Sequence, residues 1–277
     1  MNVLNFGNCI KKGKYKLHSK FRNVHNYTKD REIISLVSAK IGRGPNNVVL
    51  NNLPIFAQQT VIISNTSLSI GNAILQINKV KTKFIKDIFI KDITSLLSGI
   101  EILSDFISDK MSPKSLGSLL FSPNESYLQT TFEKAFLTHA KQAVQDISLE
   151  KLPAITKKMK GLGFGLTPSG DDFNCGILYA LNYLNEIGNG NYSEIIEECY
   201  SNSIGNNLIS NAFLKYAYLN QFYENFYKLL KALKQNKQNT ISHCAKKVIN
   251  SGHTSGADML TGFILTLKGG LNDKKLS

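Results

Sequence analysis

Apolar and polar residues alternate along the first part of the chain, up to about residue 85, with the two-residue period of β-strands. Short apolar or β-branched runs in this part are bounded by Asn, Pro and Gly, which favour turns. We expect strands at 15–21, 47–50, 60–63, 67–70 and 73–77, with a tight hairpin turn at Gly71-Asn72. The stretch 32–41 fits either a helix or a strand.

From about residue 86 the apolar residues take up helical spacing. Candidate helices lie at 88–103, 115–120, 125–147, 151–160, 193–200, 206–218, 222–234 and 240–250, and two more begin at Ser169 and Ser255. Gly269-Gly270 is expected to end the last helix. The sequence therefore predicts an α+β protein, in which an N-terminal, mostly antiparallel β domain (residues 1–85) precedes an α-helical C-terminal domain (residues 86–277).

A glycine-rich segment at 161–176, GLGFGLTPSGDDFNCG, is predicted to be a loop that leads into a buried helix. Ser169 suits the N-cap, and the first turn would hold Asp171 and Asp172, where the helix dipole favours negative charge. Glycines let backbone N–H groups approach a ligand, and a helix N-terminus binds anions. The spacing fits neither the Walker A pattern nor the dinucleotide fingerprint. The candidate ligand contacts in this segment are Gly163, Gly165, Thr167, Ser169 and Gly170.

The core of this segment recurs at 255–262, because both copies read Ser-Gly-x-Asp-x-x-x-Gly. Two interpretations are open. Each copy either starts a helix as a variant of the capping box, with a glycine for close packing, or contributes to a shared site. In the second case the helices that begin at Ser169 and Ser255 lie side by side, with their N-termini at one pocket. The second loop then adds His253, Thr254, Ser255 and Gly256 to the candidate site.

Two of the candidate carboxylates, Asp172 and Asp258, occupy the same position in the two copies. Carboxylates brought together repel each other unless a cation or a proton lies between them. Mg²⁺ bound by this pair and bridging to a phosphate is the expected occupant, ahead of a shared proton, and no other cofactor is expected. Asp171, Asp172, His253 and Asp258 are the candidate catalytic residues; the histidine is either a proton donor or a solvated loop side chain.

The formal net charge of +13 in a chain of 277 residues raises the question of nucleic acid. The positive charge is almost all dispersed lysine and no nucleic-acid-binding motif is evident, so an anionic small molecule is the expected partner. Four scattered cysteines never form Cys-x-x-Cys, which indicates a reducing compartment. Neither a signal peptide nor an apolar run of roughly 20 residues is evident. We therefore expect a cytoplasmic protein without a membrane or nucleic-acid partner.

Three further residues are candidates for ligand contact. Arg43 lies in the loop 42–47, Gly-Arg-Gly-Pro-Asn-Asn, and arginine is scarce in this chain. Its planar fork suits a carboxylate or a phosphate, although an exposed loop arginine is the alternative. Asn46 lies in the same loop. Ser210 shares a helical face with Asn207 and Asn211. This polar face points either into a site or to the surface.

The two motifs carry a resemblance to a known family. The run Gly-x-Gly-x-Gly-Leu-Thr-Pro-Ser-Gly-Asp-Asp-Phe at 161–173, followed by Thr-Ser-Gly-x-Asp-Met-Leu-x-Gly at 254–262, resembles the oxamate carbamoyltransferase subunit family typified by AllH. The elements Gly-x-Gly-Pro-x-Asn at 42–47 and Leu-Ile-Ser-x-x-Phe-Leu-x-x-Ala at 208–217 also look similar to the family, with less specificity.

The resemblance implies a cytoplasmic subunit that acts with others in anaerobic purine (allantoin) breakdown. The implied reaction interconverts carbamoyl phosphate and oxamate with oxalurate and phosphate. The Ser-Thr-x-Arg-Thr phosphate loop of aspartate and ornithine carbamoyltransferases is absent, which counts against a self-sufficient enzyme. Two alternatives stay open: a non-catalytic subunit that binds a nucleotide, an acyl phosphate or a partner, and a metal-dependent hydrolase.

Overall fold

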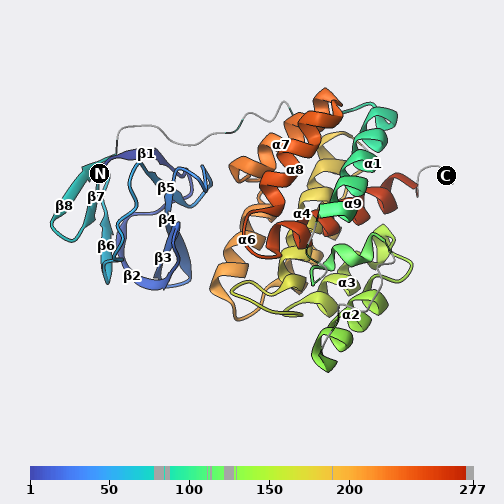
Figure 1. The fold of residues 1–277 in the computed structure, drawn as a ribbon, viewed down its shortest axis with the longest axis horizontal. Helices are drawn as coiled ribbons and strands as arrows, with labels where there is room; N and C mark the ends of the chain where they lie inside the picture. Colours follow the sequence, from blue (N-terminus) through green and yellow to red (C-terminus); the bar gives the residue numbers. More distant parts are fainter. Residues whose placement is uncertain are drawn as a thin grey trace. The chain divides into compact units, whose positions relative to one another are not determined.

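The computed structural model describes residues 1–77, 84, 88–110, 112, 114–121, 128, 130–188 and 190–272. The chain separates into two compact units, one of residues 1–85 with 221–224 and the other of residues 86–220 and 225–277 (Figure 1). The predicted fold class is confirmed, because an eight-stranded, mostly antiparallel sheet is followed by helices. Among the described helices, none has the length and apolar character needed to cross a membrane.

The β unit is built on one sheet with the strand order β1-β5-β4-β3-β2-β6-β7-β8. Its strands are β1 (Val3–Phe6), β2 (Gly13–Lys20), β3 (Val24–Lys29), β4 (Glu32–Ser38), β5 (Asn47–Leu50), β6 (Thr60–Ile63), β7 (Ser67–Ile70) and β8 (Ala73–Gln76). All neighbours pair antiparallel except β4 and β5, which are parallel. The ambiguous stretch 32–41 is therefore a strand up to Ser38, and the turn at Gly71-Asn72 joins β7 to β8 as predicted.

Alternating residues of these strands form the core of the β unit. Tyr15 and Tyr27 are completely buried and pack with aliphatic side chains from the neighbouring strands. The sequence pattern missed β3 because two polar residues interrupt it. One of them, Asn26, is buried and accepts a 2.7 Å hydrogen bond from the Ser35 hydroxyl on β4.

The helical unit contains the helices α1 (Ile93–Lys110), α2 (Thr131–Val144), α3 (Leu152–Met159), α4 (Ser169–Glu186), α5 (Ser193–Ser203), α6 (Leu208–Tyr218), α7 (Glu224–Gln235), α8 (Gln238–Ile249) and α9 (Ser255–Asn272). Two short 3₁₀ helices, η1 (Leu116–Leu119) and η3 (Leu149–Lys151), connect them. Part of the helix predicted at 125–147 lies outside the described residues. At the centre, α4 and α9 make more extensive contact than any other pair of elements (Figure 1).

The predicted end of the last helix at Gly269-Gly270 is wrong, because α9 continues to Asn272. A Cβ at Gly270 would lie 2.7 Å from the Cδ1 of Leu184 on α4. This glycine therefore gives room to a neighbouring helix and does not act as a C-cap.

Candidate functional site

The repeated motif marks the crossing of α4 and α9. A Cβ at Gly176 would lie 2.0 Å from the carbonyl oxygen of Met259, and a Cβ at Gly262 would lie 2.1 Å from that of Phe173. Only glycine allows two helix backbones to approach this closely. The prediction that the two helices lie side by side, in contact at these glycines, is confirmed.

The first glycine of each motif makes room for the end of the preceding helix. A Cβ at Gly170 would lie 1.8 Å from the carbonyl oxygen of Met159, and one at Gly256 would lie 1.9 Å from that of Val248. Both glycines are buried. The two copies are thus equivalent helix–loop–helix units, α3–α4 and α8–α9. In this structure Gly170 and Gly256 serve packing.

The first turn of α4 is already capped by the chain itself. The N-cap is Pro168, not Ser169, and the Ser169 side chain is buried as the first helical residue. The N–H of Gly170 donates to the carbonyl of Leu162 at 2.8 Å, and the N–H groups of Asp171 and Asp172 donate to that of Pro168. The amides of Gly170, Asp171 and Asp172 are therefore taken. An anion would have to use the amides of the glycine loop that precedes the helix.

Hydroxyl groups join the two loops above the helix crossing. The Thr167 hydroxyl donates to Oδ2 of Asp172 at 2.8 Å and lies 3.1 Å from the Ser255 hydroxyl. The Ser255 side chain also interacts with Asp172, while the side chains of Ser169 and Thr254 interact with Asp258. The serine of each copy thus faces the aspartate of the other copy, and one polar cluster holds both loops together.

The three aspartates have different partners. Oδ1 of Asp171 accepts a 2.7 Å hydrogen bond from the N–H of Gly161, which fixes the start of the glycine loop. Oδ1 of Asp258 accepts from the N–H of Leu116, at the start of η1, at 2.6 Å. Oδ2 of Asp258 is buried and has no hydrogen-bond donor among the described residues. A buried carboxylate oxygen without a donor is unfavourable, so this atom favours a bound proton or cation.

Burial is the main reason that the two inner carboxyl groups, those of Asp172 and Asp258, hold a proton more firmly than usual. It raises the pKa of Asp258 to about 7, although the Leu116 N–H and the hydroxyls of Ser169 and Thr254 lower it. Burial also raises the pKa of Asp172 well above its ordinary value, and the neighbouring charge of Asp258 adds to the effect. The two carboxyl groups therefore share at least one proton near neutral pH.

The raised pKa predicts that the free energy of unfolding falls as the pH rises from about 4 to about 7. In the unfolded chain Asp258 loses its proton near 3.8, whereas in the folded chain it keeps the proton until about 7, so this window favours unfolding. The loss is on the order of 4 kcal/mol, at about 1.4 kcal/mol per pKa unit. Urea unfolding of the protein and of Asp258→Asn across this window checks it. Parallel pH dependence of the two proteins would contradict the prediction.

A groove of about 510 Å³ lies against the start of the glycine loop. One wall comes from Lys160, Gly161, Pro168 and Asp171, and the other comes from the connection between α5 and α6, residues 204–207. Asn207 caps α6, and its side-chain amide also donates to the carbonyl of Leu166 at 2.7 Å. Sequence reasoning did not select Lys160 or residues 204–206, because the contact joins segments about forty residues apart. Asn207 entered only as one of the two asparagines that share a helical face with Ser210.

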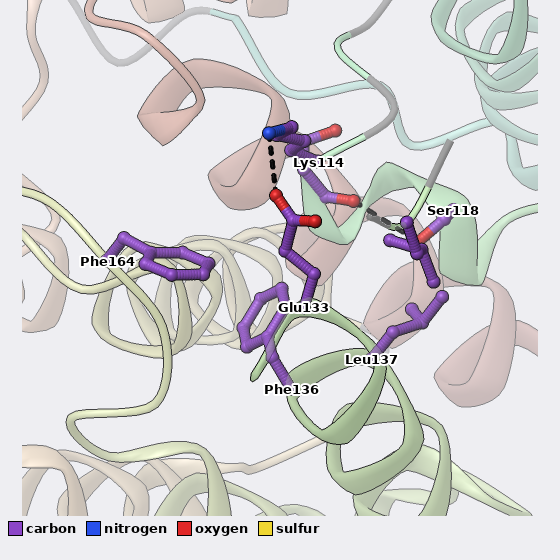
Figure 2. Close-up of a pocket in the computed structure, with 8 residues that line it drawn as sticks. Lys114, Ser118, Glu133, Phe136, Leu137 and Phe164 are labelled. Carbon is purple, nitrogen blue, oxygen red and sulfur yellow. Dashed lines mark hydrogen bonds and ion pairs between the residues drawn. The ribbon is translucent and has the colours of Figure 1, made fainter. Parts of the chain in front are cut away.

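An aromatic contact anchors the glycine loop on its other side. The ring of Phe164 packs against Phe132 and Phe136 of α2, with ring centroids 4.5 and 5.7 Å apart. Figure 2 shows Phe164 and Phe136 at a small cavity, where the Nζ of Lys114 lies 2.6 Å from Oε1 of Glu133. The cavity is about 10 Å³, room for roughly one water molecule. This side of the loop is therefore structural.

The remaining candidates lie in different places. His253 is exposed in the loop before α9, and Gly163 and Gly165 have positive φ angles of 105° and 94°. Ser210 is buried on α6, and its hydroxyl oxygen has no hydrogen-bond partner among the described residues.

Arg43 and Asn46 belong to the β unit. The Arg43 backbone N–H and Nε lie 2.8 and 3.3 Å from Oε2 of Glu224. The Asn46 amide donates to the carbonyl of Ile33 and its oxygen accepts from the Tyr223 hydroxyl. Both side chains therefore have structural partners.

The donors around Asp172 and Asp258 suit a proton better than Mg²⁺. Mg²⁺ requires six oxygen ligands in octahedral geometry and usually keeps several waters. The two carboxyl groups are buried, and the hydroxyls of Thr167, Ser169, Thr254 and Ser255 near them interact with the carboxyl groups themselves. In the part of the chain that the structure describes, no group of three or more His, Cys, Asp or Glu side chains is placed to hold a metal ion.

Fold and site together define a class: a two-unit α+β protein whose helical unit holds two helix–loop–helix copies that meet at a pair of buried carboxyl groups. Residues 159–267, which contain both copies of the motif, match the family described as oxamate carbamoyltransferase subunit AllH. The resemblance that the two motifs carry is therefore confirmed over these residues. Searches of curated proteins and of solved structures gave no match.

Proposed function

We propose that this chain is a subunit of an oxamate carbamoyltransferase that acts in anaerobic allantoin breakdown in the cytoplasm. The reaction transfers the carbamoyl group of carbamoyl phosphate to the amide nitrogen of oxamate, which gives oxalurate and phosphate. One observation carries the proposal: the family match spans both loops that meet at the hydroxyls of Thr167 and Ser255.

The phosphate-bearing substrate binds at the glycine loop in this proposal. The positive φ angles of Gly163 and Gly165 present backbone N–H groups in a conformation that other residues rarely adopt. Lys160, exposed at the edge of the adjoining groove, supplies the positive charge that the loop itself lacks. Ser255 and Thr254 at the start of α9 are the contacts from the second copy, and exposed His253 is the candidate donor to the carbamoyl oxygen.

The two inner aspartates act through other residues. Asp258 is completely buried and Asp172 nearly so, so neither reaches a substrate in the groove. Asp172 instead orients the hydroxyls of Thr167 and Ser255, and Asp258 orients those of Ser169 and Thr254. We treat both as positioning residues that share a proton, with Mg²⁺ as the less favoured occupant.

A non-catalytic subunit that binds an acyl phosphate or a partner is the second candidate. The burial of both inner carboxyl groups favours it, because a general base must lie within hydrogen-bond reach of the proton that it removes. The same burial leaves a metal-dependent hydrolase without an accessible set of ligands among the described residues.

A reconstitution assay tests the proposal. The remaining subunits of the assembly are mixed with oxalurate and phosphate, and formation of carbamoyl phosphate is measured with and without this chain. We expect turnover only when the chain is present. Full turnover in its absence would overturn the proposed function.

The variant Asp172→Asn should lower turnover in this assay by about twofold to tenfold, since a hydrogen bond between uncharged groups contributes about 0.5–1.5 kcal/mol. The expected loss arises because the amide no longer orients the Thr167 hydroxyl as the carboxyl group of Asp172 does. Asp146→Asn, at an exposed position of the same unit, is the matched control. Equal turnover in both variants would contradict the positioning role.

A further inference from the structure

A row of side chains crosses the outer face of the β unit from β2 to β8. The sheet register pairs Lys14 with Ile62, Ile62 with Ser69, and Ser69 with Ile74. The two isoleucines are exposed by 48% and 68%, on either side of a small serine. Both isoleucines point to the face of the sheet opposite the core, because side chains alternate between the two faces along a strand. Packing of the core therefore does not explain an apolar residue at either position.

Two more apolar side chains lie in the connection between β5 and β6. Ile55 and Phe56 are exposed by 81% and 76%. The Nζ of Lys20, on β2, lies 5.4 Å from the centre of the Phe56 ring, and a Cβ at Gly71, in the β7–β8 turn, would lie 3.3 Å from the Cδ of Gln58. This connection is thus held between β2 and the β7–β8 turn. We call the row formed by Ile62, Ser69 and Ile74 the isoleucine face.

The isoleucine face lies in strongly basic surroundings. Residues 1–77 contain ten lysine or arginine side chains but only two acidic ones, Asp30 and Glu32. Lys14 and Lys16 are exposed on β2 beside the face. An apolar patch with a basic rim fits an apolar patch with an acidic rim on another protein.

The end of the sheet adds a second mode of contact. β8 is the last strand in the sheet order, and Ile74 lies on it. A strand of another protein that pairs with β8 would place its own alternate side chains beside Ile74. Single-stranded nucleic acid fits less well, because it requires aromatic side chains on which bases stack, whereas the centre of this face is aliphatic.

We propose that the isoleucine face docks an acidic surface of another protein subunit, and that the lysines of β2 steer its approach. This inference rests on the proposed function only in taking the partner from the same carbamoyltransferase assembly. The substrate site lies on the helical unit, so docking at this face and substrate binding are separable by mutation.

The test uses the full chain expressed together with the other subunits of the assembly, followed by size-exclusion chromatography and titration of the purified partners. Ile62→Asp combined with Ile74→Asp should weaken binding by about a hundredfold or more, because two apolar contacts are lost and negative charge faces an acidic partner. Leu4→Asp, at an exposed position of β1 at the other end of the sheet order, is the matched control and should assemble normally.

The outcomes separate the two claims. Normal assembly of the double variant would overturn the docking face and leave the proposed function standing. Failure of the unmodified chain to assemble would overturn both. Binding of a labelled oligo(dT) by the unmodified chain, lost in the double variant, would show that the face binds nucleic acid and would also overturn the inference.

Discussion

Gly262→Ala is expected to lower the free energy of unfolding by about 3 kcal/mol, at the upper end for an overpacked core position. The added Cβ would lie 2.1 Å from the carbonyl oxygen of Phe173, so one helix backbone has to move. That movement separates α4 from α9, the most extensive contact in the helical unit, and displaces both loops of the candidate site. Urea unfolding monitored by circular dichroism measures the change.

Gly269→Ala on the same helix is the matched control. A Cβ at Gly269 would lie 3.4 Å from the nearest atom, the carbonyl oxygen of Ile147, which is ordinary contact. Because alanine favours a helix over glycine by up to about 1 kcal/mol, this variant should be as stable as the parent protein or slightly more stable. Equal losses in the two variants would show that the crossing does not require glycine at position 262.

Gly165→Val is expected to abolish binding of phosphate and carbamoyl phosphate while the protein stays folded. The φ angle of Gly165 is 94°, a conformation that a β-branched residue rarely adopts, so valine would move the backbone N–H groups of the loop. Backbone strain of this kind lowers the free energy of unfolding by about 1–3 kcal/mol. The loss of several N–H donors at once removes most of the binding energy of the anion. Isothermal titration calorimetry measures the affinity.

Gly188→Val separates strain from binding. Gly188 also has a positive φ angle, of 75°, and a Cβ there would meet nothing within 4 Å. It lies in the connection after α4, outside the groove residues. The two valine variants should therefore lose similar stability, and only Gly165→Val should lose binding. Retained affinity in Gly165→Val would place the ligand elsewhere.

The sequence predicted the fold class well because the spacing of apolar residues along a strand or helix reflects which of its side chains are buried. Strands β5, β6 and β7 begin and end at the predicted residues, since their apolar runs are bounded by Asn, Pro and Gly. β3 was missed because buried His25 and Asn26 break the pattern, and their burial depends on partners in other strands. The end of α9 was misplaced because glycine at a helix contact and glycine at a C-cap look alike in sequence.

The candidate site could be predicted in part. The shared Ser-Gly-x-Asp-x-x-x-Gly pattern predicted the meeting of α4 and α9, because a repeated glycine four residues after an aspartate lies on one helix face. The exchange of partners, in which each serine faces the aspartate of the other copy, depends on the angle of the crossing. The capping of the first turn of α4 by Leu162 and Pro168 depends on the path of the loop. No local pattern gives either feature.

The most direct test of the central claim, that the glycine loop and the start of α9 form one anion site, is a crystal structure of the full chain with carbamoyl phosphate. We expect the phosphate within hydrogen-bond distance of the backbone N–H groups of Gly163–Gly165, with the Lys160 ammonium nearby and the carbamoyl group toward Ser255. A phosphate bound instead in the β unit, at Arg43 or elsewhere, would contradict this site.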